Sequence, residues 1–191
     1  MDESGVYESI PYRMKLDQGS TTDPFETLFH ENWESVNRLL RRMVIDPAEA
    51  EDLALETFYR LYKNQNLVKA GFNTRGWLYK VAANLALQSI RSYKRRQQYE
   101  LHAGKYALEE TPETQPAELF ASNEEQRMAG MALANMHPRR AELLVLRHSG
   151  LSYKDIAQTL GLSPTSIGPL LLRAEREFEK HYRALTQEEE R

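Results

Sequence analysis

The sequence predicts an all-α protein made of two small helical domains that are joined by a flexible acidic linker. Apolar residues recur at steps of three and four in two separate stretches, which is the spacing of amphipathic helices. Between these stretches, residues 108–126 contain two prolines and six glutamates with little periodicity. No segment shows the alternation of a half-buried strand. The predicted divisions are a flexible tail (1–22), a first domain (23–98), a linker (99–126), a second domain (127–185) and a C-terminal tail (186–191).

Three amphipathic helices are predicted for the first domain, which suits a bundle of three to four helices. Asp23-Pro24 and Asp46-Pro47 each combine a helix-capping residue with a proline at the first helical position, where the missing N–H is not needed. Thr74 is predicted to cap the third helix. Trp77 falls on the apolar side of that helix, so we expect it to be a core residue.

The third helix is predicted to carry a basic face. From Thr57 to Tyr99 the chain contains nine Lys and Arg residues and no Asp or Glu. Such a run favours a polyanion as the ligand, because each phosphate that a cation contacts releases bound counterions. A solvated helix face is the alternative, and 43 residues without an acid argue against it. The polar and basic candidates are Lys80, Asn84, Gln88, Arg91, Lys94 and Arg95.

The second domain contains the pattern of a helix-turn-helix between Leu151 and Ala174. Ser152 and Asp155 predict a capping box at the start of the first helix, and Gly161 suits the left-handed residue of the turn. Leu162 is predicted to plug the core. The second helix of such a motif normally enters the major groove of DNA, and the alternative is a purely structural helical hairpin.

The second helix of this motif offers few charges to base edges. Its exposed early positions are Thr165, Ser166, Gly168, Pro169 and Leu170. Ser163, Thr165 and Ser166 can bind phosphate at the helix N-terminus, and the basic residues Arg173 and Arg176 come later. The sequence therefore predicts that this domain positions itself on the DNA backbone more than it reads bases.

Composition argues against several other classes of protein. The chain has no cysteine and its five histidines are never paired at i, i+4, so we expect no metal site and no cofactor. No phosphate-binding glycine loop and no catalytic spacing of carboxylates and histidines is present, so we expect no enzyme. No apolar run approaches the roughly 20 residues of a membrane helix. The N-terminus is acidic and polar, which is unlike a signal peptide, and we expect a cytoplasmic protein without membrane insertion.

Taken together, the two halves resemble the extracytoplasmic-function class of bacterial RNA polymerase sigma factors. The first half carries FETLFHENW, DPAEAEDLALETFYRLYKN and RGWLYKVAANLALQSIRSYKRR, which are similar to region two of that family. The second half carries HPRRAELLVLRHSGLSYKDIAQTLGLS and LLLRAERE, which are similar to region four. The resemblance covers residues 25–98 and 127–183 and implies binding to core RNA polymerase and promoter-specific initiation.

The resemblance also implies a role for each motif. AEDLALETF is similar to the helix that binds the clamp coiled coil of the largest polymerase subunit, and the matching residues are Asp52, Leu55, Glu56 and Tyr59. The family usually has Gln in place of Leu55. WLYKVAANLAL is similar to the segment that melts the minus-ten element, and Asn84 matches the position that captures an extruded base. Members of the family often break the helix near that position.

For the second half, the resemblance implies contacts with the minus-thirty-five element and with the polymerase flap. The family often has an anti-sigma factor as a further partner. Two alternatives remain open: a helix-turn-helix regulator that does not require polymerase, and a sigma-derived adaptor that binds proteins. The adaptor draws its support from Leu55, Gly168 and Pro169.

Overall fold

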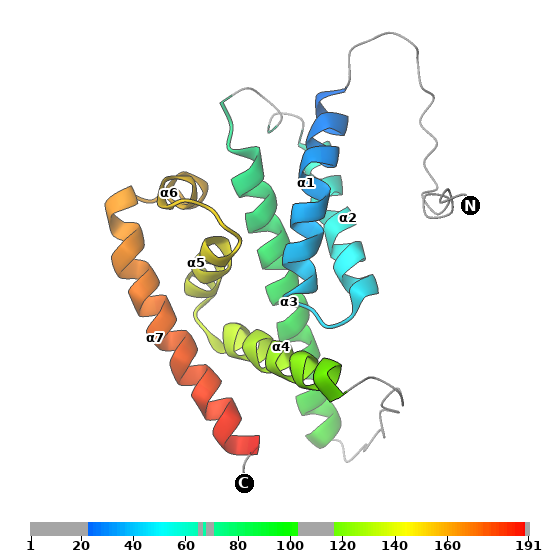
Figure 1. Ribbon diagram of the computed structural model, residues 1–191, viewed down its shortest axis with the longest axis vertical. Coiled ribbons are helices and arrows are strands. Elements are labelled where there is room, and N and C mark those ends of the chain that lie inside the picture. The colour runs from blue at the N-terminus through cyan, green and yellow to red at the C-terminus, as the bar shows by residue number, and fades with distance from the viewer. Residues whose placement is uncertain (1–22, 65–66, 68–70, 103–116, 190–191) are drawn as a thin grey trace, which may run out of the picture.

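The computed structural model describes residues 23–64, 67, 71–102 and 117–189, and these form seven helices and no strand. This confirms the predicted all-α class. The helices are α1 (Pro24–Arg41), α2 (Pro47–Lys63), α3 (Thr74–His102), α4 (Ala117–Asn135), α5 (Pro138–His148), α6 (Tyr153–Leu160) and α7 (Pro164–Glu189). In Figure 1, α1 and α2 lie on one side of the long α3, α5 to α7 lie on the other, and α4 crosses the lower part of α3.

The first two helices begin where the Asp-Pro pairs predict. The side chain of Asp23 accepts a hydrogen bond from Phe25 N at 2.9 Å, and Asp46 does the same for Ala48 N at 2.9 Å. The third helix is capped differently from the prediction. Asn73 Oδ1 accepts from Gly76 N at 2.9 Å, whereas Thr74 Oγ1 donates to the carbonyl of Leu67 at 2.9 Å.

Helices α1, α2 and α3 bury a common apolar core. Phe58 of α2 is its largest fully buried side chain, and its ring contacts Phe29 edge-on at 4.8 Å between centroids. Leu40 of α1 and Leu78 of α3 have no exposed surface. Trp77 is partly buried and packs against this core, as its position on the apolar stripe predicts. The burial of apolar surface from three helices is what holds the bundle together.

Two helices extend into the predicted linker. Helix α3 has 29 residues and continues to His102 without a break at Asn84, and the stretch from Trp77 to His102 has neither Gly nor Pro to interrupt it. Helix α4 begins at Ala117, directly after the last proline of the linker, Pro116. Residues 103–116 lie outside the described residues, as does the predicted tail 1–22, and α7 runs into the predicted C-terminal tail.

The helix-turn-helix consists of α6 and the first turns of α7. Ser152 and Asp155 form both bonds of the predicted capping box, and Gly161 has the left-handed φ of 66°. Ile156 and Ile167 are fully buried between the helices. Leu162 is 38% exposed, so the prediction that it plugs the core is wrong. The left-handed turn at Gly161 allows Leu162 N to bond back to the carbonyl of Ala157, which leaves the side chain partly outside.

The last helix is tied to the start of α5 by Glu177. Its Oε1 accepts from His137 N at 2.8 Å, and its Oε2 accepts from Arg140 Nη1 at 2.5 Å. Burial by itself would raise the pKa of Glu177, but the His137 N–H and the Arg140 guanidinium outweigh burial and lower that pKa below its ordinary value of 4.5.

This contact makes stability depend on pH in a defined direction. Because the folded pKa is lowered, the stabilisation is complete above pH 4.5 and is lost as the pH falls through the folded pKa. We expect Glu177→Gln to reduce the free energy of unfolding by about 1 kcal/mol at neutral pH. Chemical denaturation at neutral pH and at about pH 3.5 should show this difference shrinking. Glu179→Gln, which breaks only an exposed pair with Arg183, is the control; an undiminished difference in acid would contradict the expectation.

Candidate polymerase-binding and DNA-binding surfaces

The outer side of α2 carries a strip of exposed side chains that matches the predicted polymerase contact. Asp52 is exposed, Glu56 is partly buried, and Leu55 and Tyr59 each keep 53% of their surface accessible. Their spacing of three and four residues places all four on one helix face. Glu56 accepts from Arg60 Nε at 2.8 Å, which fixes one edge of the strip. Large apolar groups that remain in solvent beside a carboxylate are typical of a protein-binding surface.

Sequence reasoning missed one neighbour of this strip. Tyr62 keeps 51% of its surface accessible and follows Tyr59 by three residues on α2. Its ring contacts Phe25 of α1 edge-on at 5.4 Å between centroids, so the start of α1 supports it. The i, i+3 spacing from Tyr59 was the available signal.

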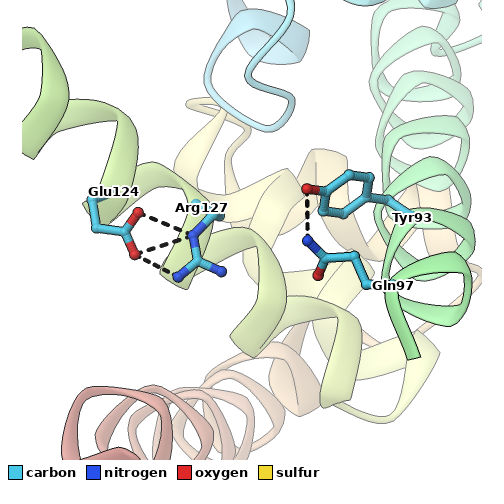
Figure 2. A network of polar contacts seen from close by, with 4 residues as sticks. All are labelled: Tyr93, Gln97, Glu124 and Arg127. Atoms are coloured by element: carbon cyan, nitrogen blue, oxygen red, sulfur yellow. Dashed lines mark hydrogen bonds and ion pairs between the residues drawn. The ribbon is translucent and has the colours of Figure 1, made fainter. Parts of the chain in front are cut away.

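The six side chains predicted to bind nucleic acid all lie on α3, as their spacing predicts. Asn84, Gln88 and Arg95 are exposed, whereas Lys80, Arg91 and Lys94 are partly buried. Tyr93 is also partly buried, and Figure 2 shows its ring reaching from α3 toward Arg127 of α4 while its hydroxyl accepts from Gln97 Nε2 at 2.8 Å. Tyr93 is therefore partly covered rather than displayed as an open stacking surface.

Three residues of this face make polar contacts with the other half of the chain. Asn84 Nδ2 donates to Oε1 of Glu142 on α5 at 2.9 Å. Arg91 Nε donates to the carbonyl of Ala134 at 3.2 Å, and Lys94 Nζ donates to Oδ1 of Asn135, both on α4. Glu142 is 8% exposed, so its carboxylate is held in the seam between the halves. None of these contacts was predicted.

A second junction joins the start of α3 to the helix-turn-helix. Asn73 Nδ2 donates to Oγ1 of Thr159 at 3.3 Å and lies 3.4 Å from the carbonyl of Asp155. Gly76 is fully enclosed there, and a Cβ at this position would lie 2.1 Å from Thr159 Oγ1. A larger residue at this position would require the side chains of Thr159 and Asn73 to move. No role was predicted for Gly76.

The seam between the halves also contains a groove. It has a volume of about 680 Å³ and is lined by residues of α1, α3, α4, α5 and α7. Leu144 and Phe178 provide apolar surface, and Arg38, Arg42 and Arg75 provide positive charge. The two halves are thus in contact without filling the space between them completely.

The predicted DNA contacts of the helix-turn-helix lie at the exposed start and middle of α7. Ser163, Thr165, Arg173 and Arg176 are exposed, and Ser166 is partly buried. The hydroxyls of Ser163 and Thr165 are 2.8 Å apart, and Ser166 N donates to the carbonyl of Ser163 at 3.0 Å. Pro169 sits inside α7, and the helix continues through it to Glu189. Hydroxyls gathered at a helix N-terminus suit a phosphate.

The described helices include none that is long and apolar enough to span a membrane.

Comparisons with known proteins agree with this arrangement. The family sigma-70 region 2 matches residues 28–96, and sigma-70, region 4 matches residues 126–178. The RNA polymerase sigma factor CarQ of Myxococcus xanthus is 33% identical over 162 residues, which cover 83% of this chain and 87% of that protein. The RNA polymerase sigma factor YlaC of Bacillus subtilis is 26% identical over 168 residues, which cover 87% of this chain and 96% of that protein. The solved structure of the sigma factor RpoE of Bartonella quintana, in complex with the anti-sigma factor NepR, superposes with a TM-score of 0.51. The superposition covers 85% of this chain and 98% of the RpoE chain at 21% identity, which supports the fold.

Two helical domains of these families, in this order, define a transcription initiation factor. The chain belongs to the extracytoplasmic-function class of RNA polymerase sigma factors. As such it binds core RNA polymerase and directs promoter-specific initiation, and a helix-turn-helix regulator or adaptor that works without polymerase is not favoured.

Proposed function

We propose that the exposed strip of α2 is the surface that binds the clamp coiled coil of the largest polymerase subunit. The observation that carries this proposal is the accessibility of Leu55 and Tyr59, at 53% each, beside the exposed carboxylate of Asp52. A helix partner would cover the apolar groups and pair with the acid, which is the usual composition of an interface centre and rim. Leu55, where the family usually has Gln, makes this contact more apolar than usual.

The basic side of α3 is proposed to hold the non-template strand of the melted minus-ten element. Asn84 is exposed and can hydrogen-bond the edge of an extruded base, while Gln88 and Arg95 are exposed and available to the strand. Extruding a base costs a few kcal/mol of lost stacking, which hydrogen bonds and phosphate contacts can offset. In this proposal the chain acts by binding, without turnover.

The helix-turn-helix is proposed to hold the minus-thirty-five element chiefly through phosphates. Ser163 and Thr165 present hydroxyls at the start of α7, and Arg173 and Arg176 are exposed further along. The exposed early surface of α7 lacks the Arg, Lys, Asn or Gln side chains that make bidentate contacts with bases.

A promoter-substitution series tests this backbone-positioning role. We expect single base changes under α7 to weaken holoenzyme binding by less than about 1 kcal/mol each, because a direct bidentate contact is worth about 1–3 kcal/mol. Arg173→Ala should instead weaken binding to all of these promoters by a similar factor and reduce its salt dependence. A loss of more than about 2 kcal/mol at one base pair would contradict this proposal.

Further partners follow by analogy. The solved relative from Bartonella quintana is a complex with an anti-sigma factor, which supports a protein of that kind as a partner here. The polymerase flap is the proposed contact of the second half, and the cytoplasm, where polymerase works, is the proposed location.

The overall proposal is tested by mixing the purified chain with core RNA polymerase and a promoter library. We expect the two proteins to co-migrate and to initiate from a restricted set of promoters. Duplex DNA binding without any association with polymerase would favour the regulator instead.

A further inference from the structure

An exposed row of residues with apolar groups runs along the outer side of α7. Thr165, Pro169 and Leu172 are all exposed, and Leu172 keeps 49% of its surface accessible. Their spacing of four and three residues places them in one row along the helix. Ile167 and Leu171 of the same turns are buried, which fixes the inner side of the helix. The row therefore faces outward, in the first turns of α7 beside α6 (Figure 1), where the second helix of a helix-turn-helix meets the major groove.

Basic side chains border this row on both sides. Arg176 continues the row four residues further on, and Arg173 is exposed next to it. Gly168 lies at the other border, where a Cβ would stand 3.8 Å from Cε2 of the exposed Tyr153. The guanidinium of Arg147 lies over that Tyr153 ring, 5.4 Å from its centre. Cations around an apolar centre match a DNA groove, whose rims are phosphates and whose floor is base edges.

The apolar centre has one favourable partner among the base edges of the major groove. Of the four bases, only thymine presents a methyl group there. An isobutyl group or a proline ring over a donor or acceptor would instead remove water from that atom without replacing its hydrogen bond, which is unfavourable. The hydroxyl of Thr165 lies 2.8 Å from that of Ser163, and the other branch of the Thr165 side chain is a methyl group. The row therefore suits contact with thymine.

We propose that Thr165, Pro169 and Leu172 recognise thymine by its C5 methyl group in the major groove of the minus-thirty-five element. This inference rests on the proposed role of the helix-turn-helix in holding that element, and it names the feature of the sequence that the helix distinguishes. Phosphate contacts set the position of α7, and the apolar row adds a preference for thymine. Each methyl contact is weak, which agrees with the small effect expected of a single base change.

Replacing thymine by deoxyuridine tests this inference, because the change removes the methyl group and keeps the hydrogen bonds of the base pair. Preformed holoenzyme is titrated with a promoter that it selects and with the same promoter carrying deoxyuridine throughout the minus-thirty-five element. We expect wild type to bind the deoxyuridine promoter at least about fourfold more weakly, which corresponds to the roughly 0.8 kcal/mol of one buried CH₂ group. Leu172→Ala should reduce this discrimination to about twofold or less. Equal binding of the two promoters by wild type would overturn the proposal.

The four affinities form a cycle that separates a direct contact from a change in the DNA itself. An effect of deoxyuridine on duplex stiffness is common to both proteins and cancels. Leu172→Ala should fold normally, because Leu172 is half exposed and alanine is the best helix former. Ile45→Ala is the matched control, since Ile45 is 48% exposed but lies between α1 and α2, and it should discriminate like wild type. An equal deoxyuridine effect in wild type and Leu172→Ala would overturn the proposal.

A gain of affinity provides a second measurement. The C5 atom of cytosine occupies the same place in the groove as that of thymine, so 5-methylcytosine adds the methyl group without changing the pairing partner. At a thymine that the deoxyuridine series identifies, cytosine is introduced with and without this methyl group. We expect 5-methylcytosine to be bound about fourfold more tightly than cytosine by wild type. Equal binding of the two would count against recognition of the methyl group.

The outcomes separate thymine recognition from the function on which it rests. Weaker binding of both promoters by Arg173→Ala, together with equal binding of the two by wild type, would overturn thymine recognition and leave the phosphate contacts standing. Insensitivity to Arg173→Ala and to deoxyuridine alike would overturn both. If Leu172→Ala instead weakened association with core polymerase and kept the deoxyuridine effect, the row would be a protein contact and the proposal would be wrong.

Discussion

Asn84→Ala is expected to reduce open-complex formation by about 30-fold while leaving the affinity for core polymerase unchanged. The amide of Asn84 is exposed on α3 and is the group proposed to hold an extruded base. Losing hydrogen bonds to a captured base costs about 2 kcal/mol, which is the scale of a good side-chain contact to a base edge and corresponds to this factor. The measurement is the equilibrium binding of preformed holoenzyme to a promoter whose minus-ten element is unpaired, alongside titration of core polymerase.

The control for this variant must allow for the contact in the free protein. Asn84→Ala removes the partner of Glu142 as well, so the free chain is altered before polymerase is added. Measuring preformed holoenzyme avoids that effect. Asn37→Ala removes an amide from α1, where its Oδ1 accepts a hydrogen bond from Arg41 Nε at 3.4 Å, and should leave open-complex formation intact. Equal activity of the two variants would show that Asn84 does not capture a base.

Tyr59→Ala is expected to weaken binding to core RNA polymerase by about 30-fold. Tyr59 is 53% exposed on α2, between the exposed side chains of Leu55 and Tyr62, and Lys63 Nζ lies 5.3 Å from the centre of its ring. Aromatic side chains at the centre of an interface often contribute 2 kcal/mol or more, which corresponds to about this factor. Because the ring is exposed in the free protein, its removal should leave the free energy of unfolding nearly unchanged.

Fluorescence titration of labelled sigma factor with core polymerase measures this affinity directly. Tyr99→Ala is the matched control, because Tyr99 is 75% exposed on α3 and lies outside the α2 strip. Transcription by Tyr59→Ala should recover when the sigma factor is supplied in excess, since the defect is in association. A loss of transcription without a loss of affinity would show that the strip is not the docking surface.

Local features of the fold were predictable because their physical causes lie within a few residues. The Asp-Pro pairs that start α1 and α2, and the capping box between Ser152 and Asp155, are bonds between neighbours in the chain. Capping at α3 was predicted one residue late, because Asn73 and Thr74 are both capping residues. The structure gives the cap to Asn73, while Thr74 bonds to the carbonyl of Leu67.

The candidate site was predictable to the same extent. The resemblance to region two marked Leu55 and Tyr59 of α2, and the absence of acids from Thr57 to Tyr99 marked α3 as basic. The sequence could not show that Arg91 and Lys94 are partly covered by α4, because a charge pattern does not show what packs against it. The prediction that Leu162 plugs the core was wrong for a related reason, since the path of the chain after Gly161 decides which way the Leu162 side chain points.

The sequence by itself therefore determined the all-α class, the two domains, the helix-turn-helix and the family, because caps, turns and helical periodicity depend on residues close together in the chain. Only the tertiary structure decided that Asn84 donates a hydrogen bond to Glu142, 58 residues later, and that Thr159 lies close against Gly76 at the start of α3. Those contacts depend on how two finished surfaces fit in space. No local propensity specifies that fit, because it is fixed only once both halves have folded.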